Sequence, residues 1–175
     1  MYANQSITPR GAGQNSLKGL TPLEALHREV ELAYVDRIGL RYLDAVVPSP
    51  AYPLEALLNP GLIGLYREVA GAPQHTVTET VSNVVGGTLV IRTLLSPQGI
   101  ALPPDLQPMS LQLDARIAAS QGGEAAVLDS DYFVTQRQSF DTQAVERQLD
   151  ASHDVIIEAF RMATTDQARR ELWQL

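Results

Sequence analysis

Six side chains have the types and spacing that a binding or reactive site would need. They are Arg37, Arg41, Arg92, Asp129, Asp131 and His153. Asp129 and Asp131 alternate within residues 124–133, a strand-like segment, so both carboxylates would project from the same face. Paired carboxylates can bind a divalent metal or share a proton. A metal would need further oxygen ligands that the sequence does not indicate, and aspartates also start turns at strand ends. We therefore expect neither a metal nor a cofactor.

Three arginines could supply the positive charge of such a site. Arg37 and Arg41 share one face of the clearest strand in the sequence, residues 34–47, with Gly39 between them. A glycine inside a strand usually marks a bulge or a close backbone approach. Guanidinium groups can clamp a carboxylate or a phosphate, with Arg92 as a further anchor. We favour the alternative, in which each arginine pairs with an acidic residue on a neighbouring strand, because such pairs are common and individually weak.

His153 interrupts the apolar stripe of a long predicted helix, residues 141–163. An imidazole at this position could act as a base, but the sequence offers no nucleophile to accompany it. We favour a histidine at the edge of the core, bonded to a carboxylate such as an aspartate on the sheet.

The composition limits what kind of protein this is. With 175 residues, 45% of them hydrophobic, the chain can form one domain, which we place at residues 21–175, after a disordered tail at 1–20. The net charge of -7 argues against binding to nucleic acid or to an acidic membrane surface. The absence of cysteine excludes disulfides and thiolate chemistry. Since we find neither a membrane-spanning stretch nor a signal-peptide pattern, we expect a cytoplasmic protein.

Hydrophobic periodicity predicts the elements that would position these residues. Helices are expected at 21–33, 54–58, 62–69, 141–163 and 166–173, and strands at 34–47, 75–85, 88–95, 111–117 and 124–133. Gly86-Gly87 predicts a two-residue hairpin turn, and a phosphate loop is disfavoured because no lysine or helix start follows it. The proline-rich segment 96–108 is long for a loop, and such loops are often functional or mobile. The expected fold is α+β, an antiparallel sheet of about five strands with a long C-terminal helix packed on one face.

Three blocks taken together resemble a known family. They are residues 37–42, residues 127–133, and His153 followed by residues 159–160 and 164–166. They are similar to the C-terminal half of a sporadically distributed, uncharacterised prokaryotic protein family that has an RIGLRY-type strand, an LDxDxF-type strand and a closing helix with a central histidine. The resemblance covers residues 22–173 and implies no catalytic residues, because no activity is established for the family.

The family resemblance also leads to an expectation about partners. Typical members have a further half upstream, whereas residues 1–20 stand in its place here. Without that half, a sheet edge or face would be uncovered, and proteins normally pair, charge or bury such edges. We therefore expect a protein partner or a homo-oligomer through the uncovered sheet surface.

Three hypotheses about function follow from the sequence. The first is a non-enzymatic binding or protein-interaction module. The second is a small-molecule-binding, hydrolase-like enzyme that uses Asp129, Asp131 and His153, with Arg41 and Arg92 as anion anchors. The third is an accessory or antitoxin-like protein of a defence locus. Convergence of those five side chains in one pocket would favour the enzyme, and their separation would favour the module.

Overall fold

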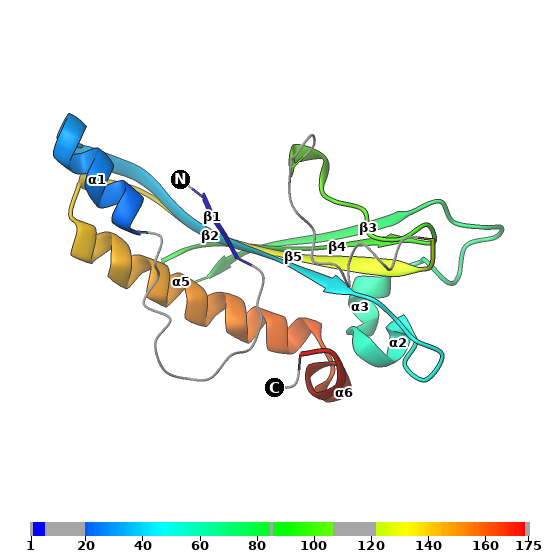
Figure 1. Ribbon diagram of the computed structural model, residues 1–175. Coiled ribbons are helices and arrows are strands. Elements are labelled where there is room, and N and C mark those ends of the chain that lie inside the picture. The colour runs from blue at the N-terminus through cyan, green and yellow to red at the C-terminus, as the bar shows by residue number, and fades with distance from the viewer. Residues whose placement is uncertain (1, 6–19, 85, 107–121, 174–175) are drawn as a thin grey trace.

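The computed structural model describes residues 2–5, 20–84, 86–106 and 122–173 of the chain (Figure 1). The strand expected at residues 111–117 lies outside these ranges. Most of the expected tail at 1–20 also lies outside them, and its described residues Tyr2–Gln5 form a short strand, β1.

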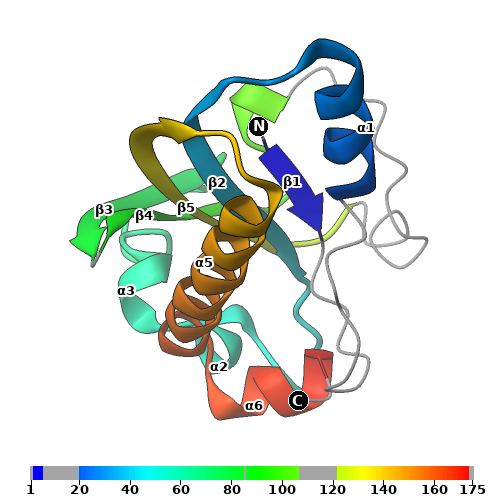
Figure 2. The ribbon, with the colours of Figure 1, turned by 90° about the vertical axis from the view of Figure 1, so that its left-hand side faces the viewer.

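The described residues form one five-stranded sheet. In spatial order its strands are β1 (Tyr2–Gln5), β2 (Tyr34–Val46), β5 (Ala125–Ser139), β4 (Gly87–Ser96) and β3 (Thr76–Val84). The last four are antiparallel, and β1 joins β2 in parallel. The predicted α+β class is confirmed, since the long C-terminal helix α5 (Thr142–Ala163) lies along one face of this sheet (Figures 1 and 2).

The longest pairing in the sheet joins β2 to β5. It extends from Tyr34 opposite Ser139 to Val46 opposite Ala126, with one irregularity between Val35 and Arg37. We expected the strand of β5 to end at residue 133, and it continues to Ser139. The reason is tertiary: the polar end of β5 lacks a strand-like apolar pattern, but the first half of β2 supplies it with a hydrogen-bonding partner.

The described residues include seven helical segments around the sheet. They are α1 (Leu20–Val30), α2 (Leu54–Leu57), α3 (Pro60–Ile63), η1 (Pro104–Leu106), α5, α6 (Asp166–Ala168) and η2 (Arg169–Trp173). Two end earlier than predicted where the backbone turns to positive φ, α1 before Glu31 (φ 47°) and α3 before Gly64 (φ 56°). The expected cap of α5 is present, because Asp141 accepts a hydrogen bond from the backbone N–H of Gln143. Within the described part of the chain, none of the helices combines the length and apolar character needed to cross a bilayer.

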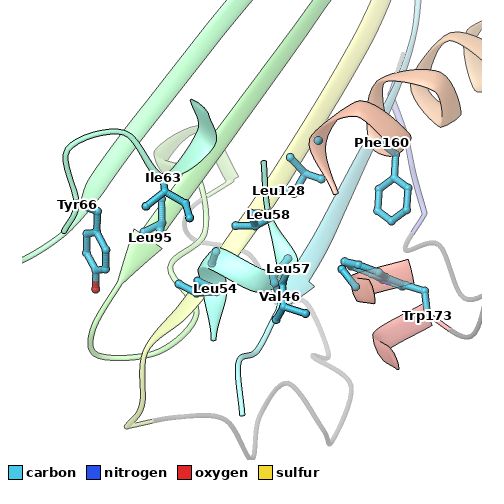
Figure 3. Packing of buried hydrophobic residues seen from close by; sticks show 13 residues of the cluster. Val46, Leu54, Leu57, Leu58, Ile63, Tyr66, Leu95, Leu128, Phe160 and Trp173 are labelled. Carbon is cyan, nitrogen blue, oxygen red and sulfur yellow. The ribbon is translucent and has the colours of Figure 1, made fainter. Parts of the chain in front are cut away.

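The core lies between α5 and the sheet. One cluster fills the space under the first half of α5, and its buried members include Leu40, Tyr42, Tyr132, Leu149 and Ile156. A second cluster closes the other end, where side chains of α2 and α3 meet the end of α5 and η2 (Figure 3). There the rings of Phe160 and Trp173 make an edge contact, with centroids 4.8 Å apart.

The turn between β3 and β4 lies one residue earlier than predicted. Val84 pairs with Gly87, so Gly87 belongs to β4 instead of the turn. Gly86 has φ 86°, which suits the turn, whereas Gly87 is needed for close approach: a Cβ there would lie 2.4 Å from the carbonyl oxygen of Phe133. The two glycines therefore serve different physical needs.

Truncating Phe160 tests the closing contact of the core. Its side chain is 1% exposed, so Phe160→Ala should lower the free energy of unfolding by about 3–5 kcal/mol. Met162→Ala, on the same helix but 57% exposed, should change it by about 0.5 kcal/mol or less. Urea unfolding followed by circular dichroism measures both values. Equal losses in the two variants would contradict this view of the core.

Candidate functional site

The structure brings five of the six predicted site residues, all except His153, together on the sheet face that points away from α5. In the strand register, Asp131 lies directly opposite Arg41 of β2, and Asp129 lies directly opposite Arg92 of β4. Neighbouring Tyr42 belongs to the cluster under α5, so the alternation of β2 directs Arg41 to the opposite side. The prediction that Asp129 and Asp131 project to the same face is confirmed.

Arg41 and Asp129 form the centre of the group. Nε of Arg41 lies 2.7 Å from Oδ1 of Asp129, and a terminal nitrogen lies 2.7 Å from Oδ2, so the guanidinium group donates two parallel hydrogen bonds. Asp129 is fully buried and Arg41 is 7% exposed. The hydrogen bond from Arg41 to Asp129 is the largest effect that raises the pKa of Arg41 above its ordinary value. Two charges removed from water are tolerated here because each satisfies the other.

Asp105 binds the outer edge of the same guanidinium group. Its carboxylate lies 2.5 and 3.3 Å from the two terminal nitrogens of Arg41. Asp105 belongs to η1, and Figure 1 shows the loop after β4 rising from the sheet on the side away from α5. The hydrogen bond from Arg41 lowers the pKa of Asp105. We did not predict Asp105 as a site residue, because its loop carries no pattern that specifies where it returns to the sheet.

Arg92 joins the group from the neighbouring strand. One terminal nitrogen lies 3.3 Å from Oδ2 of Asp129, and Nε donates a hydrogen bond to Glu79 on β3. Burial lowers the pKa of Arg92, but Glu79 and Asp129 together raise it above its ordinary value. Glu79 was also missed. With the turn at Gly86-Gly87, Arg92 would face Val81, whereas the observed turn pairs it with Glu79.

Asp131 is the least satisfied member of the group. It is 6% exposed, and its Oδ1 accepts no hydrogen bond from the described residues. A terminal nitrogen of Arg37 lies 4.0 Å from Oδ2, while the Arg37 guanidinium stacks on the ring of Phe133, 3.8 Å from its centroid. Burial raises the pKa of Asp131, and the charges of Arg41 and Arg37 oppose that effect.

His153 lies on the other side of the sheet from these carboxylates. Its Nδ1 is 2.9 Å from the phenol oxygen of Tyr42, and the two rings meet edge to face. We expected a carboxylate as its partner, and this expectation is wrong, because the α5 side of β2 presents the phenol. Burial, followed by the charge of Asp44, raises the pKa of Tyr42, so the phenol stays protonated and can donate. The sheet therefore separates His153 from Asp129 and Asp131.

The sheet face that points away from α5, called the charged face from here on, carries a network of ion pairs. The arginines and carboxylates mostly bond to one another, and the described residues contain no group of three or more His, Asp or Glu placed to hold a metal ion. Comparison of the chain with protein-family models, curated proteins and solved structures found no match.

Removing one partner of the central pair should cost much more than removing the outer one. Arg41→Met leaves the buried Asp129 carboxylate with only the longer contact to Arg92, so the free energy of unfolding should fall by about 3–5 kcal/mol. Asp105→Asn removes the charge of a side chain that is 60% exposed and should cost about 1 kcal/mol or less. Combining Arg41→Met with Asp129→Leu should recover most of the loss, as measured by urea unfolding. Equal losses in the two single variants would contradict the central role of the Arg41–Asp129 pair.

The two outer aspartates should respond to pH with opposite signs. The raised pKa of Asp131 means that the protonated carboxyl favours the fold, and this contribution is lost as the pH rises through the folded-state pKa. Asp131→Asn should therefore gain stability relative to the unmodified chain between about pH 3 and pH 7. The lowered pKa of Asp105 gives a contribution that is lost as the pH falls, so Asp105→Asn should lose relative stability over the same rise. Urea unfolding at a series of pH values measures both trends. Trends of the same sign would contradict the opposite pKa shifts of Asp131 and Asp105.

Proposed function

We propose that the chain is a non-enzymatic protein-interaction module, and that it acts by adding an extended strand of another polypeptide to the edge of β3. The observation that carries this proposal is the unprotected edge itself. Among the described strands, β3 has a single neighbour, β4, so the main-chain groups on its other side have no strand partner.

The described residues of β3 lack the sequence features that usually prevent such pairing. Proteins protect edge strands with short length, lysine, proline, a bulge or an inward-pointing charge. The nine residues of β3 include no lysine or proline, and their pairing with β4 contains no register shift. The one charge of this strand, Glu79, is bonded to Arg92. An incoming strand would therefore meet a regular edge with little net charge.

The side chains of β3 offer an apolar surface beside this edge. Val77 and Val81 are 54% and 59% exposed and lie on the same face as Glu79. In strand addition, main-chain hydrogen bonds supply affinity, and alternating side chains supply specificity. Two exposed valines at alternating positions suit an apolar or β-branched residue of the partner.

The charged face favours a binding module over the hydrolase-like alternative. Asp129, Arg41 and Arg92 are engaged with one another, and His153 lies across the sheet from them. A hydrolytic site needs a nucleophile or an activated water beside its base, and these side chains do not share one space. The network instead links β2, β5 and β4 behind the edge strand.

A selection from displayed nine-residue random peptides tests the proposal. Val84 pairs with Gly87 across a gap of only two residues in the chain, so these two form a hydrogen-bonded pair, and the N–H of Val81 then points away from β4. Val81→Pro removes this outward donor while leaving the ladder to β4 intact. We expect selected peptides to lose at least about tenfold in affinity for Val81→Pro, equivalent to about one lost hydrogen bond.

Val81→Thr is the matched control, since it keeps the edge N–H and the branched shape and should retain binding within a few-fold. Amide chemical shifts should change along β3 when a selected peptide binds. Peptides that bind Val81→Pro as tightly as the unmodified chain, with shifts away from β3, would refute strand addition at this edge.

A further inference from the structure

We infer that the strand accepted by β3 is β3 of a second copy of this chain, paired antiparallel about a two-fold axis at Thr80. This inference rests on the proposed function and specifies its partner. Thr80 is the middle residue of Thr76–Val84, so pairing about it aligns all nine residues of one copy with all nine of the other.

The hydrogen-bonding phase of β3 allows this register. The turn directs the main-chain groups of Ser82 and Thr80 toward β4, so those of Val81 and Glu79 point outward. A two-fold axis at Thr80 places Val81 opposite Glu79 of the second copy, and Val77 opposite its Asn83. Outward-pointing residues therefore meet outward-pointing residues along the whole edge.

The side chains match across the same axis. On one face Thr80 meets Thr80, a favourable hydroxyl pair between strands, and Thr78, whose hydroxyl donates to the carbonyl of Leu62, lies opposite Ser82. On the other face Val81 lies diagonal to both Val81 and Val77 of the second copy, so four exposed valines would cover one another.

Local charge does little to oppose a second copy at this edge. Each copy carries a net charge of -7, so two copies repel wherever their surfaces are acidic. Glu79 is the one charged residue of β3, and Arg92 of the same chain neutralises it. The junction thus lies on a locally neutral strip, and association should strengthen with added salt, which screens the remaining repulsion.

Single cysteines test the register, because the chain contains no other cysteine. Directly opposed residues of a non-hydrogen-bonded pair have Cα atoms about 4.5 Å apart, within the span of a disulfide. Thr80→Cys should therefore form a covalent dimer at least tenfold faster than Ser82→Cys under the same oxidant. Two copies of residue 82 would stand four positions apart, about 13 Å along the strands.

A mixture controls for differences in thiol exposure. Thr78→Cys and Ser82→Cys should each cross-link slowly alone, but together they should form the mixed dimer, because residue 78 faces residue 82. Equal rates for Thr80→Cys and Ser82→Cys, or no cross-linking in any sample, would overturn the inference.

Charged variants provide a second measurement by sedimentation velocity. Val81→Glu would place a carboxylate opposite Glu79 of the second copy and should weaken dimer formation several-fold more than Val81→Lys, which loses the same valine contacts without that repulsion. Equal effects of the two variants would count against this register.

The two proposals can fail separately. If the cysteine variants do not cross-link but selected peptides bind along β3, the second copy is the wrong partner and strand addition stands. If the peptides also fail to bind at β3, both proposals are refuted.

Discussion

The arrangement of the charged face depends on one requirement: the buried carboxylate of Asp129 needs positively charged partners within hydrogen-bonding distance. Arg41 supplies two hydrogen bonds from the neighbouring strand, and Arg92 approaches from the other side. Since an unpaired buried charge would cost several kcal/mol, the arrangement ties β2, β5 and β4 into one register. Asp105 extends this constraint to the loop after β4, because its carboxylate binds the two terminal nitrogens of Arg41.

The sheet divides the polar groups of the molecule between two environments. Its α5 side is a mostly apolar core that also holds the buried Asp44, and there Tyr42 and His153 form one hydrogen bond near the boundary with solvent. Its other side carries the arginines and aspartates in mutual contact. Residues that are adjacent in sequence, such as Arg41 and Tyr42, therefore lie on opposite sides of the sheet, Arg41 in the ion-pair network and Tyr42 in the core. This division explains why His153 does not join the aspartates and arginines with which the sequence suggested a catalytic set.

The strands, the long helix and its Asp141 cap were predictable, because each follows from local periodicity or capping chemistry. The shared face of Asp129 and Asp131 was predictable for the same reason. The pairing of Arg92 with Glu79 was not, because it depends on a one-residue difference in the turn. That difference arises from the contact of Gly87 with Phe133 and Tyr132 on a distant strand, which no local pattern records.

The pattern of residues in the sequence thus determined the class of fold and the residue types on each strand face, since alternation and helical spacing are properties of short segments. Only the tertiary structure decided which charges meet, because the register of β2 and β4 against β5 brings together residues 37 to 88 positions apart. It also decided that His153 bonds to a phenol across the sheet from the carboxylates, and that β3 is left at the edge of the described sheet. Both outcomes depend on which strands become neighbours, and pairing between distant strands is a property of the whole packed chain.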